Sequence, residues 1–427
     1  MPRTVKTNQT VVKSSGKTGR STPKATLSSG GIAAVAAVEP DLNRATKLVL
    51  ELLAIPGLSG QEGKVARFIT QQLVAAGADR AAIVHDKAHT RTPLAGEVGN
   101  LIFKLPGTIK GPPRLLMAHM DTVPICEGAR PVIDGEQIRS ADPKTGLGAD
   151  DRAGVAAVLT AALEILRNKL PHPPLTFFWP IQEEIGLHGA RHAEVKMLGG
   201  PKLAFNWDGG TPEKITIGAT GGYRMEIDVH GLASHAGVSP EKGISAIAIA
   251  SLAIADLQRD GWLGLVEKGK NRGTSNIGVI SGGDATNVVT EHVRIRAEAR
   301  SHQPAFRQRI IQQIENAFAK AAREVKSASN LRGSVEIRGT LDYEAFRLAD
   351  NEPCIVAAEG ALHSLGITPL RAVSNGGLDA NWMNVHGIPT VTLGCGQVSP
   401  HTVSERLNIA AFHVACRVAL RLATGSV

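Results

Sequence analysis

The stretch LLMAHMD at residues 115–121 is an apolar run that leads directly into two polar side chains, His119 and Asp121. A short apolar run of this kind predicts a buried β-strand that ends where the polar residues begin. Alternate residues of an extended chain face the same side, so His119 and Asp121 can project together into one crevice. One of them can bind a metal ion. A ligating imidazole usually needs a hydrogen-bond acceptor on its second nitrogen, and Asp121 is close enough to support the site in this way. Taken alone, the pair is more typical of a solvated strand end.

GLGADDRAG at residues 146–154 places two adjacent carboxylates, Asp150 and Asp151, at the predicted start of an apolar helix. This placement has a structural explanation, because a helix N-terminus favours capping side chains and negative charge. Capping needs only one of the two carboxylates, however. A carboxylate with two oxygens is also a natural bridge between two divalent cations, and we assign this bridge to Asp150.

An aromatic-rich run at residues 175–182 predicts another strand, which ends in Glu183 and Glu184. Neighbouring residues after a strand point to different sides, so one carboxylate can coordinate a metal ion while the other faces the substrate water. The free carboxylate can then act as general base on a water whose pKa the metal ion lowers. A charged loop after a strand is the structural alternative.

Two further candidates complete a set of five potential metal ligands. Asp208 ends a short apolar run that begins at Leu203, and His401 lies beyond the run at residues 389–396. The carboxyl ends of strands in an α/β sheet gather distant residues into one crevice. Five candidates in chain order, each at a predicted strand or helix end, indicate a dinuclear metal site formed by His119, Asp150, Glu184, Asp208 and His401.

The periodicity of the chain predicts an α/β fold with an insertion. Strands and helices alternate over about residues 41–218, with amphipathic helices near residues 42–55 and 63–76, which favours a mixed, mostly parallel sheet flanked by helices. From Gly221 the order becomes β-α-β-β-α-β, that of a ferredoxin-like α+β unit. We expect a catalytic domain of residues 41–218 and 340–427, an inserted domain of residues 219–339 and a basic tail of residues 1–40.

Composition limits the function classes. The net charge of +8 is concentrated in residues 1–38, which carry six basic and no acidic side chains. We predict that this tail is disordered, and that nucleic acid is not the partner, because the rest of the chain is nearly neutral. No run approaches the roughly 18 apolar residues of a membrane span. The four cysteines show no paired-ligand spacing, which fits a reducing, cytoplasmic compartment.

Several long motifs resemble one family, the dinuclear zinc peptidases and amidohydrolases that include peptidase T, carboxypeptidase G and succinyl-diaminopimelate desuccinylase. The resemblance covers about residues 41–427. It is greatest to the peptidase T-like branch, which pairs GADD-(K/R)-AG with EE-(I/V)-G and a His-Ala-Gly or His-Pro-Gly lid motif. It implies a zinc-exopeptidase type of fold in which the insertion serves as a lid. The motifs are AHMDTVP, GLGADDRAG, QEEIGLHGA, SHAGVSPEKGISAI and NGGLDAN.

The resemblance also implies a role for each candidate. Glu183 becomes the general base, and Asp121 supports the metal site. His235 becomes a donor to the developing oxyanion, with a solvated loop histidine as the structural alternative. In dimeric relatives this histidine reaches the partner's active site, which implies a homodimer formed through the lid domain. The ligands fall into two sets, His119, Asp150 and Asp208 for one metal ion and Asp150, Glu184 and His401 for the other.

Four further residues are implied as substrate contacts. Arg300 lies among other charged residues of a predicted strand, so an exposed charge ladder explains it almost as well as a clamp for a substrate carboxylate. The resemblance favours the clamp. It places Asn287, Gly376 and Gly377 at the substrate as well.

The resulting prediction is metal-assisted hydrolysis of a peptide bond in a short peptide. Histidine and carboxylate ligands without thiolate suit zinc and would also accept cobalt or manganese. The peptidase T-like resemblance favours removal of the N-terminal residue of a tripeptide. The same metal core would serve a carboxypeptidase or an N-acyl-amino-acid amidohydrolase. A non-catalytic, metal-stabilised binding protein is a further alternative.

Overall fold

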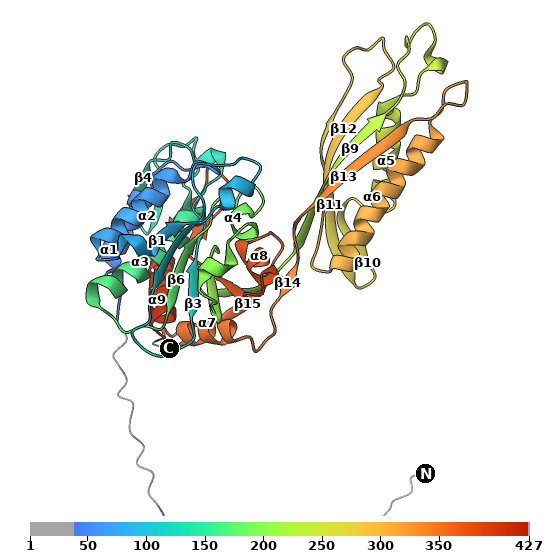
Figure 1. Ribbon diagram of the computed structural model, residues 1–427. Coiled ribbons are helices and arrows are strands. Elements are labelled where there is room, and N and C mark those ends of the chain that lie inside the picture. The colour runs from blue at the N-terminus through green and yellow to red at the C-terminus, as the bar shows by residue number, and fades with distance from the viewer. Residues whose placement is uncertain (1–37, 426–427) are drawn as a thin grey trace, which may run out of the picture. The chain divides into compact units, whose positions relative to one another are not determined.

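The computed structural model of this chain describes residues 38–425 (Figure 1). The basic tail predicted for residues 1–40 therefore lies almost entirely outside the described residues. Within residues 38–425, no helix is both long and apolar enough to cross a membrane.

A mixed sheet forms the core of the first group of elements. Its strands are β1 (Ile83–His85), β2 (Leu101–Leu105), β3 (Arg114–Met117), β6 (Leu175–Trp179), β7 (Leu203–Trp207), β8 (Lys214–Ala219), β14 (Phe346–Arg347), β15 (Leu370–Ser374) and β16 (Thr390–Leu393). The four central strands lie in the order β6-β3-β7-β16 and run parallel. Outside them, β2 and β8 pair antiparallel with β6 and β16. The prediction of a mixed α/β sheet with a parallel centre is confirmed.

The helices around this sheet are α1 (Leu42–Leu53), α2 (Gly63–Ala75), α3 (Ala149–Asn168), α4 (His188–Arg191), α7 (Pro353–His363), α8 (Asp379–Val385) and α9 (Ile409–Thr424). The amphipathic helices predicted near residues 42–55 and 63–76 are confirmed as α1 and α2. Helix α3 is buried on all sides as far as Ile165, because it packs between the sheet and helices α1 and α9. Gly154 allows this close approach, since a Cβ atom there would lie 2.5 Å from the carbonyl oxygen of Trp207 at the end of β7.

A small second sheet positions the C-terminal part of the site. Its strands are β4 (Pro131–Asp134), β5 (Gln137–Ser140), β17 (Gln397–Val398) and β18 (Arg406–Asn408), in the order β17-β18-β5-β4. Because β18 pairs with β5, the loop between β17 and β18 lies beside the segment that leads into α3. This sheet was not predicted from the sequence, because its strands are too short to show a periodic pattern.

The insertion forms a third, fully antiparallel sheet in the order β10-β11-β12-β9-β13. Its elements are β9 (Gly221–His230), α5 (Ala246–Arg259), β10 (Gly264–Lys268), β11 (Asn271–Ser281), β12 (His292–Ser301), α6 (Pro304–Glu324) and β13 (Ser334–Tyr343). Without β10, this is the predicted β-α-β-β-α-β order. The edge strand β10 was missed because it is short and largely exposed. The predicted domain boundaries, and the roles of the insertion as lid and dimer surface, stay predictions.

The two faces of the third sheet differ in chemistry. Helices α5 and α6 pack on one face, where buried side chains such as Ile227, Ile295 and Phe318 form a separate core. Along β12, buried residues alternate with more exposed ones, as a sheet covered on one face requires. The uncovered face carries charged side chains, including Arg296 and Glu298.

Candidate metal centre

The five predicted metal ligands converge at one edge of the mixed sheet. His119 follows β3, Glu184 follows β6 and Asp208 follows β7, and these strands are parallel neighbours. Asp150 lies in the first turn of α3, and His401 lies on the loop between β17 and β18. The carboxyl ends of adjacent parallel strands meet at the same edge of a sheet, which explains how residues distant in the sequence come together.

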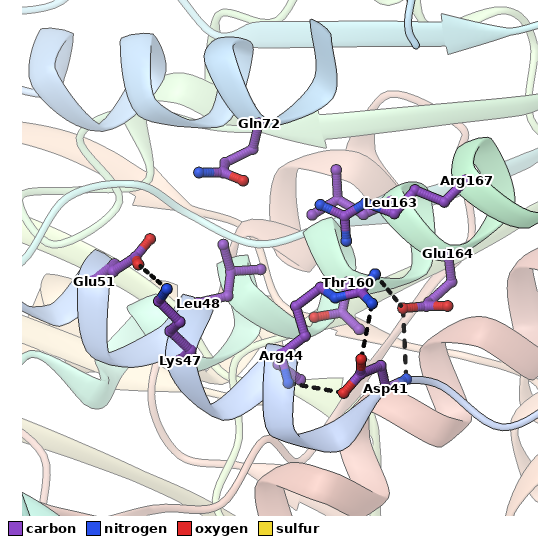
Figure 2. A pocket seen from close by; sticks show the side chains of 11 residues that line it. Asp41, Arg44, Lys47, Leu48, Glu51, Gln72, Thr160, Leu163, Glu164 and Arg167 are labelled. Carbon is purple, nitrogen blue, oxygen red and sulfur yellow. Dashed lines mark hydrogen bonds and ion pairs between the residues drawn. The ribbon is translucent and has the colours of Figure 1, made fainter. Parts of the chain in front are cut away.

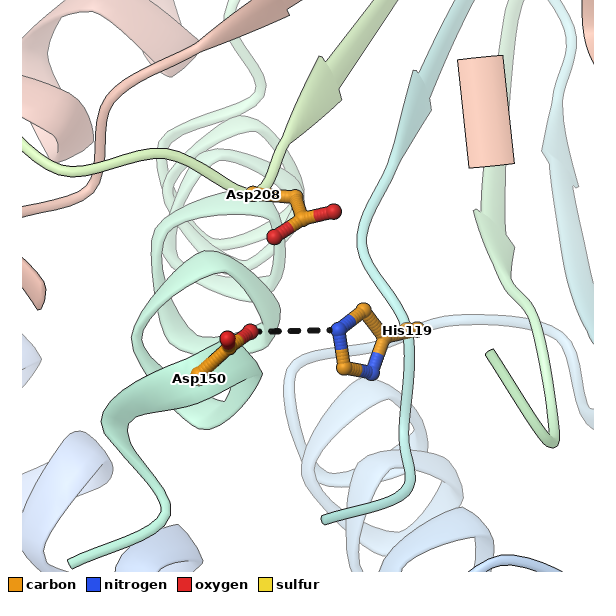
Figure 3. A group of neighbouring side chains, drawn as sticks. All are labelled: His119, Asp150 and Asp208. Atoms are coloured by element: carbon orange, nitrogen blue, oxygen red, sulfur yellow. Dashed lines mark ion pairs between the residues drawn. The ribbon is translucent and has the colours of Figure 1, made fainter. Parts of the chain in front are cut away.

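Three of these side chains form a first group (Figure 3). His119, Asp150 and Asp208 each offer a ligand atom, and these atoms all lie within 4.8 Å of one another. His119 Nε2 lies 3.3 Å from Asp150 Oδ1. Figure 3 shows the Asp208 carboxylate facing the same space from the end of β7. One imidazole and two carboxylates in this arrangement fit a divalent cation.

The second group shares Asp150 with the first. Asp150, Glu184 and His401 also place their ligand atoms within 4.8 Å of one another. His401 Nε2 lies 3.3 Å from Asp150 Oδ2 and 3.0 Å from Glu184 Oε2. The two carboxylate oxygens of Asp150 thus face different histidines, His119 and His401. This is the arrangement that a carboxylate bridge between two cations requires.

The charge balance of the cluster also fits bound cations. Burial raises the pKa of Glu183 well above its usual value, and the nearby Asp208 carboxylate adds to this rise. Burial on its own would lower the pKa of His119, but the carboxylates of Asp121 and Asp150 raise it well above the usual value. Burial thus favours the protonated form of some of these carboxylates, those of Glu183 and Asp208. Divalent cations would supply the positive charge instead and release these protons.

Asp121 connects the two loops that carry His119 and the glutamate pair. Its carboxylate accepts hydrogen bonds from Ser59 Oγ at 2.7 Å and from the backbone N–H groups of Glu183 and Glu184 at 2.9 and 3.2 Å. Two oxygens of Asp121 lie near His119 Nδ1. The backbone carbonyl oxygen is 3.1 Å away, and the carboxylate oxygen Oδ1 is 3.5 Å away. Asp121 is therefore placed to orient His119 and the segment that carries Glu183.

Glu183 lies beside the ligands, and its carboxylate has a single long ion pair with His119. Its Oε2 is 4.0 Å from His119 Nε2, and the carboxylate forms no hydrogen bond within the described residues. The side chain is nevertheless buried. A buried carboxylate held next to the ligands, with its oxygens free, is suited to exchange a proton with a neighbouring water.

Glu405, a buried residue with 1% exposure, was not predicted from the sequence. Its Oε2 accepts hydrogen bonds from the backbone N–H groups of Leu147 and Gly148 at 2.8 and 2.7 Å, and its Oε1 accepts one from Asp150 at 3.0 Å. No local pattern distinguishes this glutamate from a solvated loop residue. The one available signal was its position four residues after His401 in the same loop.

Two aspartates near the ligands were also left without a role. Asp151 is fully buried and accepts hydrogen bonds from the backbone N–H groups of His119 and Gly154, both at 3.2 Å. Asp379, in the motif NGGLDAN, is fully buried, and neither of its carboxylate oxygens has a hydrogen-bond partner. Burial raises the pKa of Asp379 to about 7. Its place at the start of α8 favours its negative charge through the helix dipole.

Two of the predicted residues lie together at one end of the insertion. His235 is exposed, and its Nδ1 accepts hydrogen bonds from the backbone N–H groups of Gly237 and Val238 at 3.1 and 3.2 Å. Asn287 lies on the adjacent loop, where its carbonyl oxygen accepts a hydrogen bond from the backbone N–H of Ala236 at 2.9 Å. Neither side chain forms a hydrogen bond or ion pair with a predicted metal ligand.

The other predicted substrate contacts lie where the insertion meets the first group of elements. Arg300 forms a bidentate pair with Glu298 at 2.8 and 3.0 Å, so its guanidinium is not a free clamp in this structure. Gly376 and Gly377 follow β15, and a Cβ atom at Gly377 would lie 2.6 Å from the ring of Tyr343. None of the three forms a hydrogen bond or ion pair with a predicted ligand.

A small pocket of about 190 Å3 lies between α1, α2 and α3 (Figure 2). Arg44 pairs with Asp41 at 2.9 Å on one side of it and approaches the buried Glu164 at 4.0 Å. The pocket lies at the end of α3 that is farther from Asp150, and no predicted ligand or substrate contact lines it. It is therefore separate from the metal centre.

Comparison with known proteins places this geometry in a family. Residues 115–425, which include all five predicted ligands, match Peptidase family M20/M25/M40. Over 362 residues, covering 84% of this chain and 92% of the other, the protein is 33% identical to the uncharacterized protein YqjE of Bacillus subtilis.

Two crystal structures share the fold over nearly their whole length. A tripeptidase from Staphylococcus aureus superposes with a TM-score of 0.81 and 30% identity, covering 91% of this chain and 99% of that chain. The aminopeptidase PepT from Bacillus cereus superposes with a TM-score of 0.78 and 30% identity, covering 90% and 98%. The family resemblance inferred from the motifs is thus confirmed, and the chain belongs to Peptidase family M20/M25/M40.

Proposed function

We propose that this family member is a dinuclear metal-dependent aminopeptidase that removes the N-terminal residue of tripeptides. The observation that carries the proposal is the position of Asp150, whose two oxygens face His119 and His401, each at 3.3 Å. The two similar structures are described as a tripeptidase and as an aminopeptidase, each 30% identical to this chain, which supports the substrate class.

The proposed ligands are one imidazole and two carboxylates for each cation, with Asp150 shared. Zinc is the proposed metal because this donor set contains no thiolate, and cobalt or manganese would also fit. Cations bound here would polarise the substrate carbonyl and lower the pKa of an attacking water.

Glu183 is the proposed general base. Asp121 holds its backbone N–H at 2.9 Å, and its carboxylate oxygens are free to accept a proton from the attacking water and return it to the leaving amine. His235 is the proposed donor to the developing oxyanion. Because its Nδ1 accepts two backbone hydrogen bonds, the proton of the neutral ring belongs on Nε2, which is then free to donate.

His235 also connects the proposal to the oligomeric state. We expect a homodimer formed through residues 219–339, in which His235 reaches the partner's metal centre. A cytoplasmic location is proposed as well, since the four cysteines are buried and unpaired, as in a reducing compartment.

The test compares one free tripeptide with its N-acetylated and C-amidated forms, using zinc-loaded protein and mass spectrometry. Cleavage of the free and amidated peptides, but not of the acetylated one, is expected for an aminopeptidase. Preference for the acetylated peptide would move the assignment to a carboxypeptidase or an N-acyl-amino-acid amidohydrolase. Absence of cleavage in all three would contradict a peptidase and leave the non-catalytic, metal-stabilised binding protein. Glu183→Gln is the matched control, because it keeps the shape of the site without the base.

A further inference from the structure

A hollow of about 1000 Å3 reaches the segment that directly follows the proposed ligand Glu184. Ile185, the neighbour of the proposed ligand Glu184, lines it, as does His188 of α4. The other wall is the uncovered face of the third sheet, with residues of β9, β11, β12 and β13. A peptide with one end at the metal ligands would therefore extend along this hollow.

Guanidinium groups outnumber carboxylates in the hollow. Five arginines but only three acidic residues line it. Each of the three acidic side chains already faces a guanidinium, so none is left to neutralise a further cation. These pairs are Asp342–Arg224 at 2.6 Å, Glu298–Arg300 at 2.8 Å and Glu226–Arg338 at 3.9 Å.

Three of the lining arginines form no ion pair with a carboxylate of residues 38–425. We call Arg91, Arg191 and Arg296 the arginine cluster. Arg91 donates to the backbone carbonyl oxygen of His192, and the Arg191 guanidinium lies over the Trp382 ring, 4.9 Å from its centroid. Arg296 has neither kind of contact. No carboxylate of the described residues therefore lies within ion-pair distance of the cluster, although the Asp342 carboxylate, which pairs with Arg224, is close enough for Arg191 to act on its pKa.

The two histidines of the same wall respond to this positive charge. Burial and the neighbouring cations, including Arg191 and Arg224, lower the pKa of His188 to about 4. Burial, with Arg191 and Arg91 nearby, also lowers the pKa of His192. Both imidazoles are thus neutral near pH 7, and the positive charge of the wall resides on its arginines.

We propose that the arginine cluster binds carboxylates of the substrate, and that the enzyme prefers acidic peptides. A terminal carboxylate of a peptide brings one negative charge, which one arginine can bind in a bidentate manner. Three arginines that form no ion pair with a carboxylate of the described residues match a peptide that carries an acidic side chain in addition to its terminal carboxylate. This inference rests on the proposed function, because it requires a peptide bound at the metal centre.

The test measures kcat/KM of the zinc-loaded full chain for Ala-Ala-Glu, Ala-Glu-Ala and their glutamine counterparts, with Ala-Ala-Ala as reference. We expect kcat/KM of one glutamate peptide to be about tenfold higher than that of its glutamine counterpart at low ionic strength, because its KM is lower. This difference should shrink at 0.5 M salt, since salt screens the charges. Arg191→Gln and Arg296→Gln, singly and together, should reduce the ratio toward one. Arg323→Gln, on an exposed face of α6 outside the hollow, should retain it.

The outcomes separate this inference from the proposed function. If the glutamine peptides and Ala-Ala-Ala are cleaved but glutamate brings no advantage, the acidic preference is wrong and the peptidase assignment stands. If no peptide is cleaved, the proposed function fails and this inference fails with it. Each peptide is also tested with its C-terminal carboxylate amidated, to identify which carboxylate is bound. If amidation abolishes the preference for glutamate over glutamine, the cluster binds the terminal carboxylate. The proposed preference for an acidic side chain is then wrong. Circular dichroism of each variant checks that it is folded.

Discussion

The carboxylate of Glu405 accepts a hydrogen bond from the backbone N–H of Asp150 at 3.0 Å. Glu405 lies on the loop between β17 and β18, four residues after His401. The same carboxylate accepts two more backbone N–H groups, from Leu147 and Gly148. One buried side chain thus fixes the segment that carries the shared ligand Asp150 against the loop that carries His401.

We predict that Glu405→Gln weakens metal binding. The amide group would turn an N–H2 toward backbone N–H donors, which would loosen the position of Asp150 relative to His401. Changes behind a metal ligand typically reduce affinity by about 10-fold to 100-fold. Isothermal titration with zinc measures the effect directly. Glu136→Gln is the matched control, because Glu136 is an exposed residue of the adjoining β4–β5 turn, and it should bind as the unaltered chain does. Equal affinity in both variants would contradict the positioning role.

The substitution Glu183→Gln is expected to separate metal binding from turnover. Loss of a general base lowers kcat by about 10²-fold to 10⁴-fold. Metal content should not change, because Glu183 is not among the proposed ligands. Tripeptide turnover and metal content by mass spectrometry are measured on the same preparation. A variant that keeps full activity would exclude Glu183 as the base.

Asp150→Asn and Asp208→Asn should differ in the number of ions that they lose. Asp150 belongs to both ligand groups, whereas Asp208 belongs to one. An amide offers a single weakly donating oxygen, so Asp150→Asn should impair both sites and Asp208→Asn only one. Equilibrium dialysis gives the bound equivalents. Two tightly bound ions in Asp150→Asn would contradict the bridge.

Asp228 should make the insertion sensitive to acid. Its carboxylate lies 2.8 Å from His292 Nε2 and 3.2 Å from Arg294 Nε and also pairs with Arg338, and these partners lower its pKa from 3.8 to about 2. A carboxyl with a lowered pKa in the folded state adds stability above its unfolded pKa, and this stability disappears as the pH falls from about 4 through about 2.

The Tm of Asp228→Asn should therefore be a few degrees lower than that of the unaltered chain at pH 6. Near pH 2 the two Tm values should be equal. Thermal unfolding followed by circular dichroism at several pH values measures this. The exposed Asp284→Asn serves as control and should show no such dependence. A constant difference at all pH values would rule out the ionised pair as its source.

Much of the site was predictable because its signals are local. Strand β3 ends two residues before His119, and strand β6 ends four residues before Glu183, as expected from the change from apolar to polar residues. Such changes depend on neighbours in the sequence only. Glu405 and the small sheet of β4, β5, β17 and β18 were not predictable in this way. A buried glutamate that accepts backbone hydrogen bonds has the same local sequence as an exposed one, and strands of two to four residues show no periodicity.

The sequence by itself determined which residues stand at the ends of strands and helices, and through its motifs it determined the family. Only the tertiary structure decided that the two oxygens of Asp150 face His119 and His401, and that Arg300 is already paired with Glu298. It also decided that the arginine cluster forms no ion pair with a carboxylate of the described residues. The physical reason for this division is that the spacing of apolar residues indicates which side of a single helix or strand is buried. Distances between elements depend on the order in which β6, β3, β7 and β16 pair, and that order is set by packing across the whole sheet.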